Sequence, residues 1–145
     1  MKILKKISLL FLLTTAFVSC NDDKPDTVGP EVEITNIPDN KEYKFGETIV
    51  MNFEFRDKVG MYEYEYKLYA EENTSNGFTT ENYVDLQPSF YSTYNKIHTI
   101  ALPEKSAKAT YQEGDYVIKV QASDINQNVS VYYKPIRIVY PETEE

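Results

Sequence analysis

The sequence has no tryptophan, one cysteine, one histidine and only five glycines. A lone cysteine excludes an intrachain disulfide, so packing alone must stabilise the fold. The single histidine, His98, argues against zinc, copper or another transition metal, because those sites favour several His or Cys ligands. The glycines form no phosphate-cradling loop.

The residues that catalysis needs are also scarce. His98 lies in a predicted strand without a nucleophile elbow beside it, so a Ser-His-Asp triad is not expected. Glu63 and Glu65 share a strand face and imitate a glycosidase pair, but Lys67 follows them and a solvated charged face is the better interpretation. The sequence therefore predicts no catalytic residue, no enzyme and no cofactor, a calcium ion excepted.

Cys20 is the most informative residue that is present. Three lysines precede an apolar run at residues 7–18, which Ser19 follows. This is the pattern of a secretory signal, and the run is shorter than the roughly 20 residues that cross a bilayer. Residues 17–20 (Phe-Val-Ser-Cys) resemble the lipobox of bacterial lipoproteins, although Phe17 replaces the usual leucine. The resemblance implies that residues 1–19 are removed and that Cys20 is acylated, and two or more acyl chains anchor a protein stably.

Two short motifs after Cys20 indicate a location. Residues 21–23 (Asn-Asp-Asp) resemble the surface-export signal of lipoproteins in Bacteroidota-type Gram-negative bacteria. Residues 26–28 (Asp-Thr-Val) resemble a motif that those bacteria O-glycosylate, which makes Thr27 a candidate acceptor. A solvated acidic tether is the alternative interpretation of both. Beside a lipobox, they predict a lipid-anchored protein of the outer membrane that is exposed on the cell surface.

Charge and length restrict the partners and the domain organisation. Residues 1–19 contain three lysines and no acidic residue, so their removal leaves 126 residues and changes the formal net charge from −8 to −11. Such a module repels nucleic-acid phosphates and anionic membrane surfaces, and nucleic acid is not expected as a partner. We expect a lipidated flexible tether over residues 20–30, one folded domain over 31–140 and an acidic tail over 141–145.

Alternation of apolar and polar residues predicts short strands through most of the domain. Tyr62, Tyr64 and Tyr66 share one strand face and are expected in the core. In the last strand the apolar positions change parity at Pro135, which predicts a bulge there. Residues 71–95 alternate poorly, apart from a possible short strand at 83–86, and predict an irregular insert. An insert of this length is often functional.

About seven short strands without a helical period predict an all-β, antiparallel sandwich. Tyr116 stands where an immunoglobulin-like fold has a tyrosine corner, at the start of strand F. Residues 115–128 resemble strand F and the F–G turn of bacterial immunoglobulin-like modules, and residues 55–61 resemble their B–C turn. Over about 30–140 the chain resembles a family of uncharacterised immunoglobulin-like lipoproteins of Bacteroidota. That family is a domain of unknown function, so the resemblance implies a fold and a location but no activity.

The expected F–G turn carries a candidate calcium site. Asp124, Asn126 and Asn128 offer oxygens at alternate positions, and Asp57 is expected at the same end of the sandwich. Calcium takes about six to eight oxygens, and these residues name four side-chain donors. A turn in which Asp and Asn cap their own backbone amides is the alternative.

The expected insert is unusually aromatic. Its tyrosines and phenylalanines suit recognition of a protein or a sugar, because they give large contact areas at low entropic cost. The alternative is that they fold back as a cover over the sandwich edge. The candidate binding residues are Phe78, Tyr83, Phe90, Tyr91 and Tyr94.

These observations predict a non-enzymatic outer-membrane lipoprotein that binds or scaffolds an envelope protein. A carbohydrate-binding accessory lipoprotein with a glycan ligand is one alternative, although the lack of tryptophan counts against it. A calcium-stabilised surface adhesin is the other.

Overall fold

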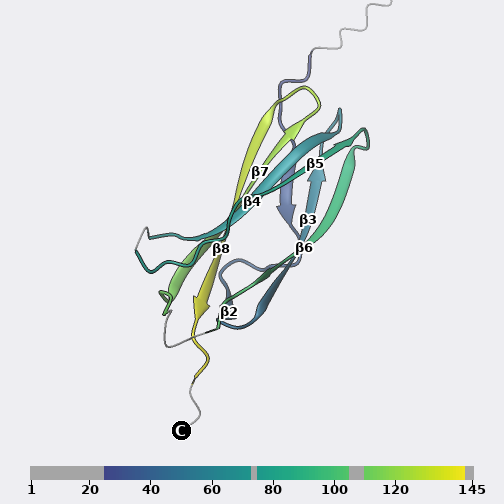
Figure 1. The fold of residues 1–145 in the computed structure, drawn as a ribbon. Coiled ribbons are helices and arrows are strands. Elements are labelled where there is room, and N and C mark those ends of the chain that lie inside the picture. The colour runs from purple at the N-terminus through teal and green to yellow at the C-terminus, as the bar shows by residue number, and fades with distance from the viewer. Residues whose placement is uncertain (1–24, 73–74, 105–109, 143–145) are drawn as a thin grey trace, which may run out of the picture.

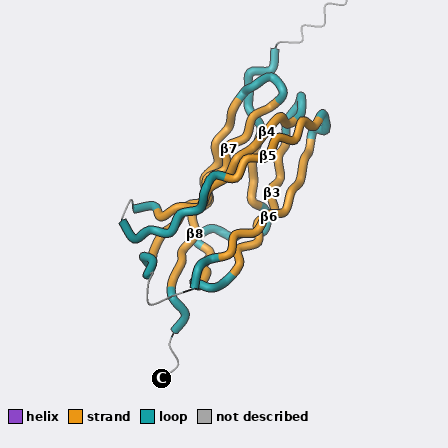
Figure 2. The backbone as a smooth tube through the Cα atoms, in the orientation of Figure 1, coloured by secondary structure: helices purple, strands orange, loops and turns teal. Residues whose placement is uncertain are grey.

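The computed structural model describes residues 25–72, 75–104 and 110–142, so Cys20 and the expected signal lie outside the described residues. The described chain forms eight strands, one more than expected, and no helix long and apolar enough to cross a membrane occurs in it. The strands, coloured in Figure 2, are β1 (Glu31–Ile34), β2 (Lys41–Lys44), β3 (Thr48–Arg56), β4 (Met61–Ala70), β5 (Tyr83–Ser89), β6 (Thr93–Ala101), β7 (Gly114–Asp124) and β8 (Val129–Val139).

The strands form two packed sheets, which confirms the predicted all-β sandwich (Figure 1). One sheet has the order β1-β3-β6 and the other the order β2-β8-β7-β4-β5. All pairs are antiparallel except β2 with β8. In immunoglobulin terms the sheets correspond to strands A-B-E and A′-G-F-C-C′, so the sandwich is immunoglobulin-like.

Alternation along the strands places the core between the sheets. On β3, Ile49, Met51, Phe53 and Phe55 are at most 1% exposed, because every second side chain points inward. Tyr64 and Tyr66 of β4 face them from the other sheet and are also buried. The prediction that Tyr62 shares this face is wrong. The pairing of β4 shifts between Met61 and Glu63, and Tyr62 is left 41% exposed.

The bulge predicted at Pro135 is absent. The pairing of β7 with β8 runs without a shift from Ser123↔Val129 to Gly114↔Ile138, and Pro135 lies opposite Val117 within it. The parity of the apolar residues changes because the first half of β8 turns its apolar side chains outward, leaving Val129, Val131 and Tyr133 between 44% and 56% exposed. The prediction assumed that the apolar residues of a strand face the core, whereas those in the first half of β8 face solvent.

The expected insert is shorter than predicted. Of residues 71–95, the range 83–89 belongs to β5 and residues 93–95 begin β6, so strand pairing fills much of it. The described residues outside these strands are 71–72, 75–82 and the turn at 90–92. Thr80 lies beside β4, since its N donates to Leu68 O and its Oγ1 accepts from Leu68 N. β5 and β6 are edge strands, and most of their side chains are exposed or half-buried. Their sequences therefore show little alternation of apolar and polar residues.

The tyrosine corner is confirmed. Tyr116, 1% exposed at the start of β7, donates its hydroxyl hydrogen to the carbonyl oxygen of Gln112 at 2.6 Å. The same hydroxyl accepts a hydrogen bond from Phe78 N at 3.2 Å. These bonds tie the chain before β7 and the segment after β4 to one buried side chain.

Candidate functional site

Four segments meet at one end of the sandwich, which we call the loop end: residues 25–30, 57–60, 89–92 and 124–128. It is the upper end in Figure 1, where the described chain begins. Ile125 N donates to Gly60 O at 3.2 Å, Asp57 N donates to Ser92 O at 3.0 Å, and Asn128 Nδ2 donates to Asp26 O at 3.0 Å. These bonds connect each of the four segments to another.

Gly60 lets two of these loops pack against each other. Its φ is +104°, a conformation that side chains with a Cβ rarely adopt. A Cβ at this position would lie 2.1 Å from the carbonyl oxygen of Ser89 and 2.9 Å from Phe90 Cα. Glycine is therefore required for the close approach of the β5–β6 turn.

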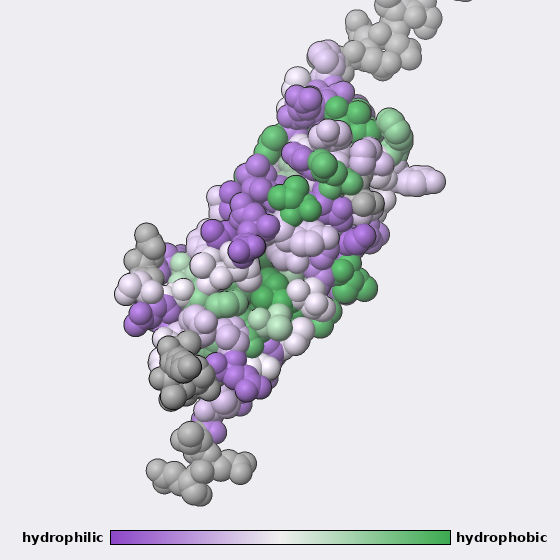
Figure 3. Space-filling view, viewed as in Figure 1, coloured by the Kyte–Doolittle hydropathy of each residue, from purple (hydrophilic) through white to green (hydrophobic). Residues whose placement is uncertain are grey.

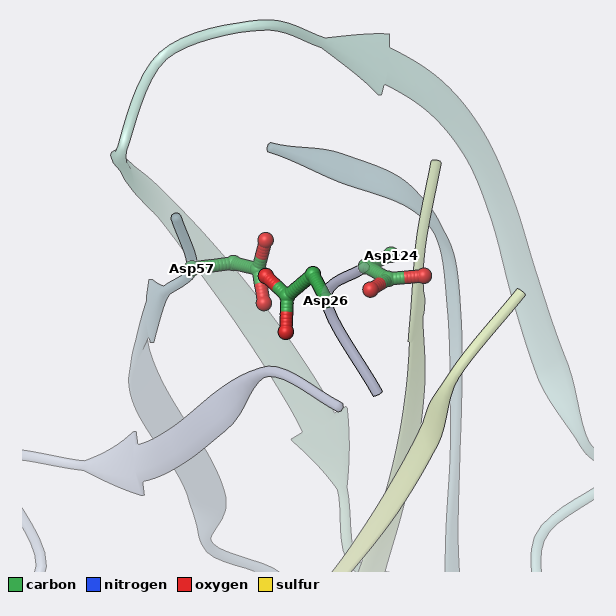
Figure 4. A group of neighbouring side chains, drawn as sticks. All are labelled: Asp26, Asp57 and Asp124. Atoms are coloured by element: carbon green, nitrogen blue, oxygen red, sulfur yellow. The ribbon is translucent and has the colours of Figure 1, made fainter. Parts of the chain in front are cut away.

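The loop end holds an acidic triad of Asp26, Asp57 and Asp124. Each offers a carboxylate oxygen within 4.8 Å of the other two, and Asp26 lies between the others in Figure 4. Asp124 is 0% exposed, while Asp26 and Asp57 are half-buried. Three carboxylates this close repel one another, and a cation between them would offset that repulsion.

Backbone and amide donors orient the three carboxylates, and Asp26 accepts a hydrogen bond from Val28 N at 3.1 Å. Asp57 accepts hydrogen bonds from Val59 N at 2.7 Å and Gly60 N at 3.0 Å. Asp124 accepts from Asn128 N at 2.7 Å and Asn128 Nδ2 at 2.6 Å. These are the turn-capping bonds that the sequence offered as the alternative to calcium. Capping and cation binding are compatible here, because oxygens of Asp26 and Asp57 still face the shared space.

The structure regroups the predicted calcium ligands. It brings Asp57 and Asp124 together, as expected, and adds Asp26, which sequence reasoning placed in a flexible tether. Asn128 turns its amide nitrogen toward Asp124 and Asp26. Asn126 is exposed. Asp26 was missed because its nearness depends on a contact across 102 residues.

The predicted aromatic binding residues separate into two groups. Phe78 and Tyr94 pack against the core, Phe78 on Tyr111 and Tyr94 on Phe55, and Tyr83 stacks on Tyr66 while it remains 42% exposed. Phe90 and Tyr91 project from the β5–β6 turn and are 82% and 80% exposed. The edge-cover interpretation therefore fits the first group, and only the second is a free surface.

A polar network lies inside the sandwich beside the open β5 and β6 edges. The buried Tyr64 hydroxyl donates to Asp85 Oδ2 at 3.0 Å and lies 2.6 Å from His98 Nε2. Because the single hydroxyl hydrogen goes to Asp85, His98 Nε2 carries the hydrogen of the second bond. Burial and then Lys96 lower the pKa of His98, with Asp85 opposing them. Burial and the hydrogen bond to Asp85 raise the pKa of Tyr64.

The outer face of the five-stranded sheet carries a shallow open groove of about 430 Å³. Lys67 and Lys119 lie directly opposite each other across β4 and β7, and Tyr69 and Tyr133 flank them along the groove. Glu65 and Gln121 continue it toward the loop end, and Glu63 lies beyond them. Among the described residues, neither lysine has an ion pair, although Lys119 Nζ donates to Gln121 Oε1 at 3.4 Å.

Thr27 is exposed on the segment that approaches the loop end, and Cys20 lies outside the described residues. Their modification stays a prediction.

No known family matches the chain, and no curated protein is similar to it at the sequence level. Solved structures with a similar fold include a superoxide reductase (neelaredoxin) from Ignicoccus hospitalis in a T24K form, with 12% identity, a TM-score of 0.49, and 80% of this chain covering 84% of that one. A second structure of the Ignicoccus hospitalis protein has 11% identity and a TM-score of 0.48, with coverages of 76% and 80%. Murine CRIg has 10% identity and a TM-score of 0.42, with coverages of 78% and 98%.

Two expectations are corrected by these findings. The expectation that the chain is not an enzyme is corrected, since two of the similar solved structures are named as superoxide reductases. The expectation of no cofactor does not stand either, since the acidic triad places three possible metal-binding side chains together. A likeness at 11–12% identity transfers no activity to this chain.

Proposed function

We propose that this protein is a lipid-anchored module of the outer membrane that binds an envelope protein through the outer face of its five-stranded sheet. The observation that carries the proposal is an apolar surface on that face. Five side chains from its two flanks are 44–59% exposed: Val84, Leu86, Val129, Val131 and Tyr133.

The register of the strands arranges these side chains in two ridges. One row across the sheet runs Leu86, Glu63, Ser123, Val129, and the next runs Val84, Glu65, Gln121, Val131. The apolar ends of these rows lie on β5 and β8, three strand spacings or about 14 Å apart. Polar side chains fill the space between them.

This pattern suits a partner that contributes apolar side chains at both ridges and polar groups between them. Protein interfaces combine apolar and aromatic contacts with hydrogen-bonding groups in this way. A solvated sheet with no partner needs no such ridges, because the outer positions of an antiparallel sheet are normally polar. Figure 3 shows apolar side chains among polar ones on the face of the molecule that it displays.

Site-specific photo-crosslinking in intact cells tests the proposal. A crosslinking amino acid at Val131 should capture one dominant envelope protein. The matched control is Val50 on β3, which is equally exposed at 44% but lies on the other sheet. Equal or absent crosslinking at the two positions would contradict the outer face as the binding surface.

A second candidate ligand is a glycan in the groove. Tyr69 and Tyr133 can stack on sugar rings, and Lys67, Lys119 and Gln121 can bond sugar hydroxyls or carboxylates. If a glycan binds there, oligosaccharides should raise the melting temperature of the wild type and leave that of the Tyr133→Ala variant unchanged. No rise with either neutral or acidic oligosaccharides would argue against this candidate.

A further inference from the structure

The described chain starts at the loop end, and this limits how far the domain can stand from its proposed anchor. The segment from Cys20 to Pro25 contains five residue steps, which span at most about 18 Å even when fully extended. Pro25 immediately precedes Asp26, which is bonded to Asn128 at the loop end. A lipid on Cys20 would therefore hold the loop end, and not the opposite end, close to the bilayer.

The most exposed apolar side chains of the described residues gather at this same end. Phe90 is 82%, Tyr91 80% and Val28 70% exposed, and these are the three highest values among the exposed large hydrophobic residues. Phe90 and Tyr91 are consecutive in the turn that packs on Gly60. Val28 is two residues from Asp26, and Gly29 beside it packs against the start of β8.

The charged groups of the loop end are arranged differently from the aromatic ones. Asp124 is fully buried, and Asp26 and Asp57 are half-buried, whereas the two aromatic side chains project into solvent. Lys58 is the exposed cation of this end among the described residues. Aromatic side chains are favoured at the headgroup level of a membrane, while acidic groups repel anionic headgroups. The surface therefore fits a zwitterionic headgroup layer.

We propose that the loop end is a membrane-contacting surface, in which Phe90 and Tyr91 enter the headgroup region of the bilayer that holds the lipid on Cys20. The inference rests on the proposed lipid anchor. It adds an orientation. Phe90, Tyr91 and the lipid on Cys20 would all contact the membrane at one end of the sandwich, so its long axis would stand upright on the bilayer. The outer face of the five-stranded sheet then stands away from the bilayer, open to a partner.

The absence of tryptophan makes the contact measurable. The lipidated chain with Tyr91→Trp is purified from membranes and reconstituted in phosphatidylcholine vesicles, with or without bromine on the acyl chains. The control is Tyr133→Trp, at a side chain that is 56% exposed in the middle of β8. We expect bromine to quench the tryptophan at position 91 and to leave the one at 133 unchanged. The tryptophan at position 91 should also emit at shorter wavelength than the one at position 133.

Flotation of the same samples separates the two proposals. A chain that floats with the vesicles but shows no quenching at either position overturns the membrane contact and leaves the anchor standing. Equal quenching at both positions also overturns it, because the domain would then lie on its side. A chain that does not float overturns the anchor, and the inference with it. An aromatic tip reserved for a protein partner would give the first of these results.

Discussion

His98 illustrates at the scale of one residue how a half-buried polar group links stability to pH. It contacts the rings of Phe53, Tyr66 and Tyr83, and its Nε2 lies 2.6 Å from the hydroxyl of Tyr64. Burial and Lys96 lower the pKa of His98 below its ordinary value of 6.5, against the attraction of Asp85. The folded chain therefore takes up a proton at lower pH than the unfolded chain does.

We expect the free energy of unfolding to fall as the pH is lowered from 6.5 through the pKa of His98 in the folded state. In this window the unfolded state binds more protons, so stability is greatest above it, and each unit of pKa difference contributes about 1.4 kcal/mol. Urea denaturation at several pH values measures the effect. The His98→Gln variant should lose this part of the pH dependence, and an unchanged dependence would show that other groups cause it.

The acidic triad gives a second prediction at this scale. Calcium should raise the melting temperature of the wild type, because the three carboxylates supply part of its oxygen shell and waters complete it. At a free calcium concentration of about ten times Kd, binding contributes about 1.4 kcal/mol, or about 5 °C for a domain of this size. Asp57→Asn should abolish the rise, since the amide keeps an oxygen for the bonds from Val59 and Gly60 but removes a charge.

The matched control for calcium is Glu81→Gln. It removes an equal charge from an exposed position between β4 and β5, outside the segments that form the loop end. In the presence of a chelator, Asp57→Asn should be at least as stable as the wild type because it relieves repulsion within the triad. A calcium-dependent rise that survives Asp57→Asn would rule out the triad as the binding site.

At the scale of elements, the packing of the β3–β4 turn against the β5–β6 turn depends on Gly60. Gly60→Ala should lower the free energy of unfolding by about 2–5 kcal/mol, because a strained φ and a clash with Ser89 add together. Gly114→Ala separates the two effects, since Gly114 also has a positive φ (+137°) but a Cβ there meets nothing within 4 Å. Its cost should be about 1–2 kcal/mol. Chemical denaturation compares the two variants, and equal losses would exclude the clash as the cause.

The strands show where the sequence pattern succeeds and where it fails. Alternation identifies β3 because its inward side chains are apolar and its outward ones mostly polar. It fails in β8, where Val129, Val131 and Tyr133 are apolar and outward. Apolarity indicates burial only when no binding surface requires the same chemistry, so this failure coincides with the proposed interface.

At the scale of the whole molecule, attachment to the membrane depends on one residue. The Cys20→Ala variant should leave the detergent phase and become soluble, because the proposed acyl chains provide the stable anchor. Folding should not change, since Cys20 precedes the described domain. Phase partition and circular dichroism measure the two effects. A variant that remains in the detergent phase would show that something other than a lipid on Cys20 holds the protein.

The candidate site was partly accessible to sequence reasoning. Asp57 and Asp124 were expected together because the B–C and F–G turns of an immunoglobulin-like sandwich lie at one end. Asp26 was not, because its segment has the composition of a tether and its contact with Asn128 joins distant parts of the chain. The polar network of Tyr64, Asp85 and His98 was missed for the same reason, since its members come from three strands in two sheets.

The sequence by itself determined the fold class and the tyrosine corner. These depend on side-chain period and on one local turn, which neighbouring residues specify. The tertiary structure alone decided which apolar residues face outward, that Asp26 joins Asp57 and Asp124, and that the described residues begin at the end of the sandwich that carries Phe90 and Tyr91. Each of these depends on strand register and sheet order, because contacts between residues far apart in the chain form only when the two sheets pack.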